Sequence, residues 1–212
     1  MVKTRLAKNL PVEAATELYC CLLSDTIALA RSLDSVEVAI MCPAPDVMEL
    51  TELANGLVNV VAQHGEGLAA GLASVFAHFA AGDRRRIVAF NSDSPHLPAS
   101  ILLSAFEALY RHDVVVGPTH DGGYYLVGAK AIHPTLFDGG DMGTESALDA
   151  LLTRARMLQL SVGFTDPFYD IDVEGDLTRL AEELRLAPAK APRTAAWLEE
   201  RAQTGARSRT GR

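Results

Sequence analysis

The chain has 212 residues, of which 49% are hydrophobic and 22% are charged, and its formal net charge at pH 7 is -8. This length and composition predict one globular domain with a single substantial core. The acidic balance argues against a nucleic-acid backbone or an anionic membrane surface as the main partner, because both select for basic surfaces. Small molecules remain as the expected partners, and a homodimer is left open.

The cysteines Cys20, Cys21 and Cys42 lie in apolar segments and lack the spacing of metal ligands. Free thiols in a reducing compartment are therefore the simplest interpretation. The chain has no run of about 18 or more apolar residues, and its first residues, MVKTRLAKNL, lack the apolar core of a signal peptide. These features predict a cytoplasmic protein.

Helix-like and strand-like patterns alternate nearly throughout the chain. Apolar residues at helical spacing predict helices over residues 11–33, 47–55, 65–81, 99–110, 144–156 and 174–186. Short apolar runs predict strands over residues 36–42, 58–62, 87–90, 114–117, 124–128 and 158–164. The alternation predicts an α/β fold with a mostly parallel, helix-covered sheet, to which 114–117 and 124–128 form an antiparallel addition.

The chain changes composition after Leu186. Residues 187–212 are rich in Ala, Pro, Arg, Ser and Gly, and the last stretch, QTGARSRTGR, has no apolar face to bury. We therefore predict a domain over residues 1–186 and a tail over 187–212 whose end is disordered.

The central stretch, RIVAFNSDSPHL, places an acid directly after a predicted strand. Asp93 follows the strand 87–90, and ligands of open α/β sheets bind in the crevice beyond the carboxyl ends of the strands. A carboxylate at this position is suited to holding a metal or a substrate. The alternative is that Asp93 or Ser94 only starts a turn or caps the helix that begins near Pro98.

Two further loops carry groups suited to a ligand. Lys3, Thr4 and Arg5 place two cations around a hydroxyl before a helix, which suits phosphate oxygens, although a basic amino terminus is also commonplace. In the loop DGGY, two glycines allow close backbone approach while an acid and a ring offer polar and stacking contacts. A plain hairpin turn would select the same residues, which are Asp121, Gly122, Gly123 and Tyr124.

A pair of acids follows the last predicted strand, in the segment YDIDVEGDL. Asp170 and Asp172 are alternate residues of an extended segment and so point the same way. Together with Asp93 they predict an oxygen-rich site for a hard divalent cation such as Mg²⁺.

Four segments together carry a family resemblance: VKTRLA, SDSPHLP, GPTHDGGYYLVG and YDIDVEGDL. The chain resembles the GT-A-fold nucleotide-diphospho-sugar transferase-like family that includes arsenosugar-biosynthesis-type glycosyltransferases. It is more distantly similar to the guanylyltransferases of phospholactate or phosphoenolpyruvate and to molybdenum-cofactor nucleotidyltransferases. The resemblance implies a Rossmann-like GT-A fold in three layers, a nucleotide sugar or nucleoside triphosphate as donor, and a small-molecule acceptor.

The resemblance also implies roles for individual residues. Lys3, Arg5 and Asp93 match the groups implied in catalysis, with the two cations on the nucleotide phosphates. Asp93, Asp170 and Asp172 match the ligands of Mg²⁺ or Mn²⁺. The nucleotide- and substrate-binding positions are Lys3, Thr4, Arg5, Gly67, Asp121, Gly122, Gly123, Tyr124, Thr144 and Glu145.

The chain departs from the family pattern at three places. The family has a first strand and a glycine-containing loop ahead of VKTRL, whereas this chain starts at Met1 within that loop, so a missing or truncated first strand is expected. Met142 stands where relatives often have Trp. Ala69 and Ala70 follow the Gly67-Leu68 turn where relatives often have polar or charged residues.

Three functions fit these residues. Glycosyl transfer from a nucleotide sugar ranks first, because the family with the best overall motif match carries that label. Nucleotidyl transfer is the alternative, since Asp93-Ser94-Pro95 is closer to the Asp-x-Pro of nucleotidyltransferases than to the Asp-x-Asp of glycosyltransferases. A non-catalytic nucleotide-binding module is the third, although buried carboxylates are costly to keep without a cation or other partner.

Overall fold

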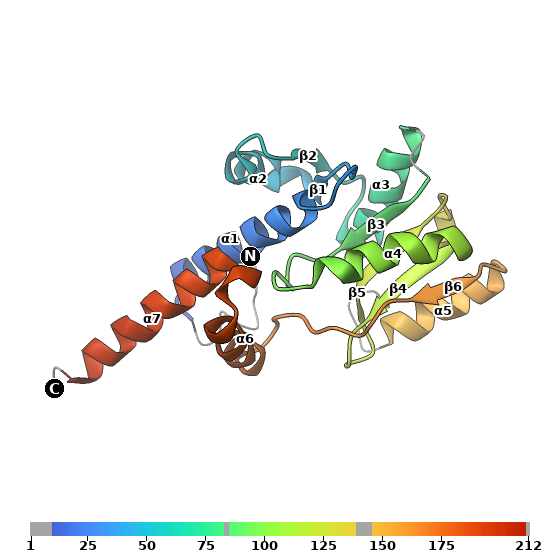
Figure 1. Ribbon diagram of the computed structural model, residues 1–212. Helices are drawn as coiled ribbons and strands as arrows, with labels where there is room; N and C mark the ends of the chain where they lie inside the picture. The colour runs from blue at the N-terminus through green and yellow to red at the C-terminus, as the bar shows by residue number, and fades with distance from the viewer. Residues whose placement is uncertain (1–9, 83–84, 139–145, 211–212) are drawn as a thin grey trace. The chain divides into compact units, whose positions relative to one another are not determined.

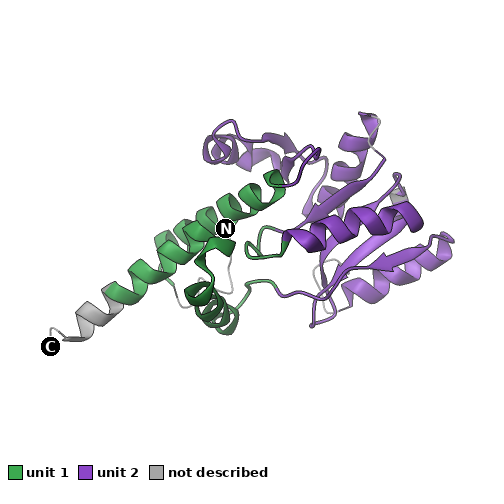
Figure 2. Cartoon of the chain, viewed as in Figure 1, with its two compact units in different colours: residues 1–32, 92–98, 170–212 green, residues 33–91, 99–169 purple. Residues whose placement is uncertain are grey.

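The computed structural model describes residues 10–82, 85–138 and 146–210 (Figure 1). The chain divides into two compact units. The domain boundary predicted at residue 186 stays a prediction. Unit 1 comprises Met1–Ser32, Ser92–Pro98 and Asp170–Arg212, and unit 2 comprises Leu33–Asn91 and Ala99–Tyr169 (Figure 2). Unit 1 is therefore built from segments that are far apart in the sequence, whereas the two segments of unit 2 are separated only by residues 92–98.

A four-stranded sheet forms the centre of unit 2, in the order β3-β5-β4-β6. Its strands are β3 (Ile87–Phe90), β4 (Val114–Pro118), β5 (Tyr124–Ala129) and β6 (Val162–Phe164). β5 is antiparallel to both β3 and β4, whereas β4 and β6 are parallel. The predicted antiparallel pairing of β4 and β5 is confirmed, with β5 inserted in the middle of the sheet.

A second, two-stranded sheet of unit 2 consists of the parallel strands β1 (Ala39–Cys42) and β2 (Asn59–Ala62). The turn η2 (Ala44–Asp46) and helix α2 (Val47–Ala54) connect them, as a parallel pair requires a crossover. The described strands thus form two sheets, where a single sheet was expected. Each strand lies within a predicted range or exceeds it by one residue. The strand predicted over 158–164 begins only at Val162, because Gln159 turns the chain with a φ of 56°.

Helices cover both faces of the four-stranded sheet. A buried cluster joins one face to helices α3 (Gly67–Ala81), α5 (Ala147–Met157) and the turn η3 (Pro134–Phe137). Within it the rings of Phe76 and Phe137 stack, with centroids 5.2 Å apart. Because successive strand residues point to opposite faces, Val114 and Val116 face this cluster while Val115 faces the other side, where α4 (Ala99–Arg111) packs (Figure 1). The predicted three-layer α/β architecture is confirmed.

Unit 1 is built on α1 (Val12–Arg31), whose buried residues Leu18 and Leu22 recur at helical spacing. α6 (Glu174–Leu186), the turn η4 (Pro188–Lys190) and α7 (Pro192–Thr210) complete it. No helix in the described part of the chain is both long and apolar enough to cross a membrane.

The tail predicted over residues 187–212 contains the helix α7, which packs along α1. The disorder predicted for the end of the tail stays a prediction. The buried Asp25 of α1 accepts hydrogen bonds from the backbone N–H of Arg193 (3.2 Å) and of Thr194 (2.8 Å), and from the Thr194 hydroxyl (2.8 Å). Trp197 Nε1 donates to Glu17 Oε2 at 3.2 Å. An acid of α1 therefore caps the first turn of α7.

Candidate functional site

The loop that carries Asp93 is Ser92–Pro98, which follows β3 in the sequence and belongs to unit 1. Hydrogen bonds hold the backbone of its first two residues, Ser92 and Asp93. The hydroxyl of Thr26 lies 3.3 Å from the carbonyl oxygen of Ser92, and the N–H of Ile171 donates to the carbonyl of Asp93 at 2.9 Å. The side chains of Ser94 and His96 are buried. The loop is therefore fixed by α1 and by the segment that precedes α6.

The Ile171–Asp93 hydrogen bond brings two of the predicted acidic segments together. Ile171 stands between Asp170 and Asp172, so both of these acids lie beside the backbone of Asp93, and all three are half-buried. Asp176 fixes this segment from the first turn of α6, since its Oδ2 accepts hydrogen bonds from the N–H groups of Asp172 (3.0 Å) and Val173 (2.9 Å). Sequence reasoning missed Asp176, although an acid three residues into a predicted helix is a known capping signal.

The carboxylates do not by themselves complete a metal site. Within residues 10–82, 85–138 and 146–210, no group of three or more His, Cys, Asp or Glu side chains is placed to hold a metal ion. Asp93, Asp170 and Asp172 are thus brought into neighbouring segments without forming a three-carboxylate cluster. Binding of Mg²⁺ or Mn²⁺ by these residues stays a prediction.

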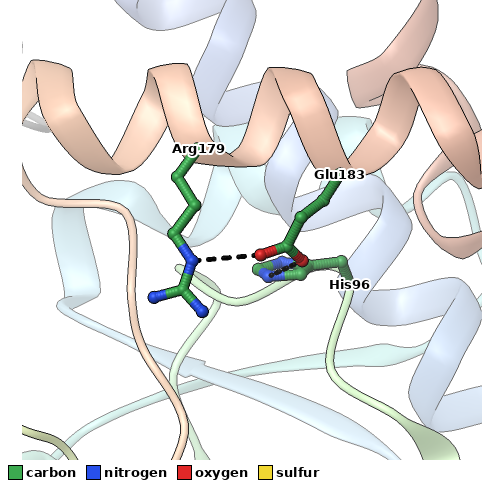
Figure 3. A network of polar contacts seen from close by, with 3 residues as sticks. All are labelled: His96, Arg179 and Glu183. Carbon is green, nitrogen blue, oxygen red and sulfur yellow. Dashed lines mark hydrogen bonds and ion pairs between the residues drawn. The ribbon is translucent and has the colours of Figure 1, made fainter.

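A buried histidine of the same loop contacts α6. His96 Nε2 lies 3.7 Å from Glu183 Oε2, and Arg179 Nε donates to Glu183 Oε1 at 3.0 Å (Figure 3). Burial lowers the pKa of His96 to about 4, while the nearby Glu183 carboxylate acts in the opposite direction. His96 is consequently neutral at pH 7. Sequence reasoning passed over it, because nothing local marks a histidine in SDSPHLP as buried.

The predicted substrate loop Asp121–Gly123 is a tight turn of unit 2. The N–H of Thr119 donates to the carbonyl of Gly123 at 3.1 Å, and Asp121 Oδ1 accepts from the Thr119 hydroxyl and from the N–H of Gly123. Gly122 has a φ of 88°, a conformation that favours glycine. Its carbonyl accepts from the N–H of Leu148 at the start of α5, at 3.1 Å. The hydrogen bonds of Asp121 Oδ1 are thus those expected if this residue only stabilises a hairpin turn.

Tyr124 is the ring that was predicted to offer a stacking contact to a ligand. It is half-buried in β5 and packs against the core cluster of unit 2, and this burial raises the pKa of its hydroxyl. The next residue, Tyr125, is buried and lies 2.9 Å from Thr165 through their hydroxyl oxygens. The two tyrosines therefore contribute to the core on both faces of β5.

Gly67 is the first residue of α3 and follows the loop that connects β2 to this helix. Gly65 and Gly67 have φ angles of 81° and 82°, and the side-chain amide of Gln63 donates to their carbonyls at 3.0 and 3.3 Å. The N–H of His64 donates to Ser74 Oγ at 2.8 Å, which ties the loop to α3. Gln63 and Ser74 build this exposed helix entrance and were not found from the sequence, because their partners are backbone groups.

Five of the predicted site residues lie outside the part of the chain that the structure describes: Lys3, Thr4, Arg5, Thr144 and Glu145. Asp121 belongs to unit 2, whereas Asp93, Asp170 and Asp172 belong to unit 1. The convergence of the two groups therefore stays a prediction.

Two solved structures define the class of fold. The chain resembles a presumed nucleotide-diphospho-sugar transferase from Desulfovibrio desulfuricans G20, with a TM-score of 0.85 and 24% identity over 95% of this chain and 89% of the other. It also resembles the 4-diphosphocytidyl-2C-methyl-D-erythritol synthase of Anaerococcus prevotii DSM 20548, with a TM-score of 0.55 and 13% identity over 79% and 86% of the two chains. The protein has the mixed α/β fold of nucleotide-diphospho-sugar transferases.

The family assignment is independent of these structures. Residues 26–144 match the model of a family described as uncharacterized protein conserved in bacteria, DUF2064. This match spans more than half of the chain, and the protein belongs to that family. No curated protein sequence matches the chain significantly.

Proposed function

We propose that the protein is a nucleotide-dependent transferase that moves a group from a nucleotide sugar or a nucleoside triphosphate to a small acceptor. The observation that carries this proposal is the hydrogen bond from Ile171 to Asp93, which holds an acidic loop after a sheet strand beside a second acidic segment. Sites of open α/β sheets lie beyond the carboxyl ends of strands. The fold is shared with a protein named as a nucleotide-diphospho-sugar transferase and with a 4-diphosphocytidyl-2C-methyl-D-erythritol synthase.

The reaction requires little covalent chemistry from the protein. Catalysis depends on neutralising phosphate charge while the acceptor is held in line with the leaving group. In this proposal Lys3, Thr4 and Arg5 bind phosphate oxygens, and Gly67 together with residues 121–124, Thr144 and Glu145 lines the donor and acceptor pocket. Asp93, Asp170 and Asp172 would supply carboxylate oxygens to Mg²⁺ or Mn²⁺, which neutralises phosphate charge when bound.

Glycosyl transfer ranks first, since the similarity to the Desulfovibrio protein extends over nearly the whole of both chains. Nucleotidyl transfer is the second candidate, favoured by the local sequence Asp93-Ser94-Pro95. Pro95 stands at the position of the second acid of an Asp-x-Asp pair, so the loop presents one acid. Membership of the arsenosugar-biosynthesis-type glycosyltransferases and a cytoplasmic location belong to the same proposal.

The leaving group distinguishes the two reactions. The protein is incubated with nucleotide sugars and, separately, with nucleoside triphosphates and pools of small acceptors, with and without Mg²⁺. Glycosyl transfer releases a nucleoside diphosphate, whereas nucleotidyl transfer releases pyrophosphate. A thermal-shift screen of the same donors reports binding directly, because a ligand that binds only the folded state raises its stability.

Asp93→Asn is the variant that tests the site, and Asp34→Asn, at an exposed position of unit 2, is its matched control. We expect Asp93→Asn to abolish turnover and Mg²⁺-dependent stabilisation while the control behaves as wild type. Donor binding without turnover in the wild type would favour a non-catalytic nucleotide-binding module. Turnover that survives in Asp93→Asn would rule out the role of Asp93.

A further inference from the structure

A basic groove lies in unit 2, at the end of the four-stranded sheet where β3 begins and β5 ends. Its volume is about 800 Å³, within the usual range for small-molecule sites. The described lining residues come from the ends of α3 and α4, from the segment before β3 and from the segment after β5: Ala80, Arg85, Arg86, Leu109, Tyr110, Lys130, Ala131 and Ile132.

Tyr110 orients two of the cations that line this groove. The guanidinium carbon of Arg86 lies 4.0 Å from the centroid of the Tyr110 ring, and Lys130 Nζ donates to the Tyr110 carbonyl at 3.5 Å. Arg85 is exposed beside them. A cation held against a ring or a carbonyl loses less side-chain freedom when a ligand binds than a freely solvated one. The groove thus offers charges that are partly pre-organised.

The groove is positive although the chain is acidic. None of its described lining residues is Asp or Glu, whereas the chain as a whole has a net charge of -8. The acid that faces Lys130 is Asp113, whose Oδ2 already accepts hydrogen bonds from Ser161 N (2.9 Å) and Ser161 Oγ (2.6 Å). The described wall of the groove thus holds three cations and no carboxylate, while Asp113, outside this wall, interacts electrostatically with Lys130.

None of the described residues that line this groove belongs to the site proposed around Asp93. Arg86 precedes β3 and Asn91 follows it, so these residues mark opposite ends of the strand. At a rise of roughly 3.3 Å per residue, the two ends are roughly 16 Å apart. The proposed transfer reaction therefore assigns no role to the residues that line the groove.

We propose that the groove binds a small molecule carrying two or more anionic groups, phosphate or carboxylate. Arg86 can form paired hydrogen bonds with either group, while Lys130 and Arg85 supply further charge. The apolar side chains of Ala80, Leu109 and Ile132 provide a surface for the remainder of the molecule. The nature of the anion is left to the experiment.

Isothermal titration of the full chain with pyrophosphate and with citrate, at fixed ionic strength, tests the proposal. The test variant is Arg86→Ala/Lys130→Ala, and the matched control is Arg156→Ala, which removes an exposed charge of unit 2 away from the lining residues. We expect the double variant to bind at least tenfold more weakly and the control to bind within twofold of wild type. The tighter probe identifies the anion class.

A second pair of variants separates this groove from the proposed phosphate loop. Lys3→Ala/Arg5→Ala should leave the groove affinity unchanged, and Arg86→Ala/Lys130→Ala should leave nucleotide binding unchanged. Arg86→Lys is included in case the double variant does not fold. This substitution keeps the positive charge but removes the planar guanidinium group, so it should weaken binding of the anion about threefold. Wild-type affinity in both Arg86 variants, or no heat of binding with either probe, would overturn the proposal.

Discussion

At the scale of single residues, His96 shows how burial links the candidate site to pH. Its folded pKa, about 4, lies below the ordinary value of 6.5, so the unfolded chain binds more protons between these values. Stability attributable to this residue is complete above pH 6.5 and is lost as the pH falls toward 4. The difference between these two pKa values corresponds to a free energy of unfolding of about 3 kcal/mol at most.

The free energy of unfolding of His96→Gln should therefore fall less than that of the wild type as the pH is lowered. Urea unfolding at pH 7 and at pH 4.5 provides the measurement, and we expect the wild type to lose about 2 kcal/mol more than the variant over this interval. His120→Gln, at an exposed position, is the matched control. Parallel curves for wild type and His96→Gln would contradict the burial argument.

The role of Asp121 in the turn can be tested with a substitution that keeps the shape of its side chain. Because its Oδ1 accepts two hydrogen bonds within the turn, Asp121→Asn should preserve stability to within about 0.5 kcal/mol, whereas Asp121→Ala should lose about 1 kcal/mol. Thermal unfolding measures both. If Asp121→Asn is stable and yet loses turnover, the charge of Asp121 acts on substrate in addition to its role in the turn.

At the scale of elements, the cap that Asp25 provides for α7 should be the largest single polar contribution to unit 1. Asp25→Ala leaves the buried N–H and hydroxyl of Thr194 without their acceptor, so we expect a loss of about 2–4 kcal/mol. Asp25→Asn retains an acceptor and should lose less. Asp34→Ala, an exposed acid, should change the free energy of unfolding by less than about 0.5 kcal/mol.

The same contact explains what sequence reasoning could and could not predict. β3 and α6 were predicted with the bounds that the structure has, because each is specified by a local apolar pattern with turn residues at its ends. The helix α7 was missed, because the acid that caps it stands in α1. Likewise the role of Asp176 and the burial of His96 depend on partners that no local pattern reveals. The sequence therefore predicted the acids of the candidate site but not the residues that hold their loops in place.

At the scale of the whole molecule, removal of α7 should damage unit 1 more than the composition of the segment indicates. Truncation before Pro192 removes the partners of Asp25 and Glu17 and uncovers part of α1. We expect increased binding of a hydrophobic dye and a lower midpoint of thermal unfolding. Truncation after Gln203 keeps Thr194 and Trp197 and is the control; equal effects of both truncations would contradict the importance of this packing.

The discontinuous make-up of unit 1 also constrains how the protein can be made. Thr194 stands 169 residues after its acceptor Asp25, so α1 leaves the ribosome long before the helix that packs along it has been synthesised. During that interval unit 2, whose segments lie within Leu33–Tyr169, can already be complete. The apolar face of α1 is meanwhile unprotected, and contacts of such long sequence separation form slowly. A nascent chain stalled before α7 should therefore be the form of this protein that chaperones bind most strongly.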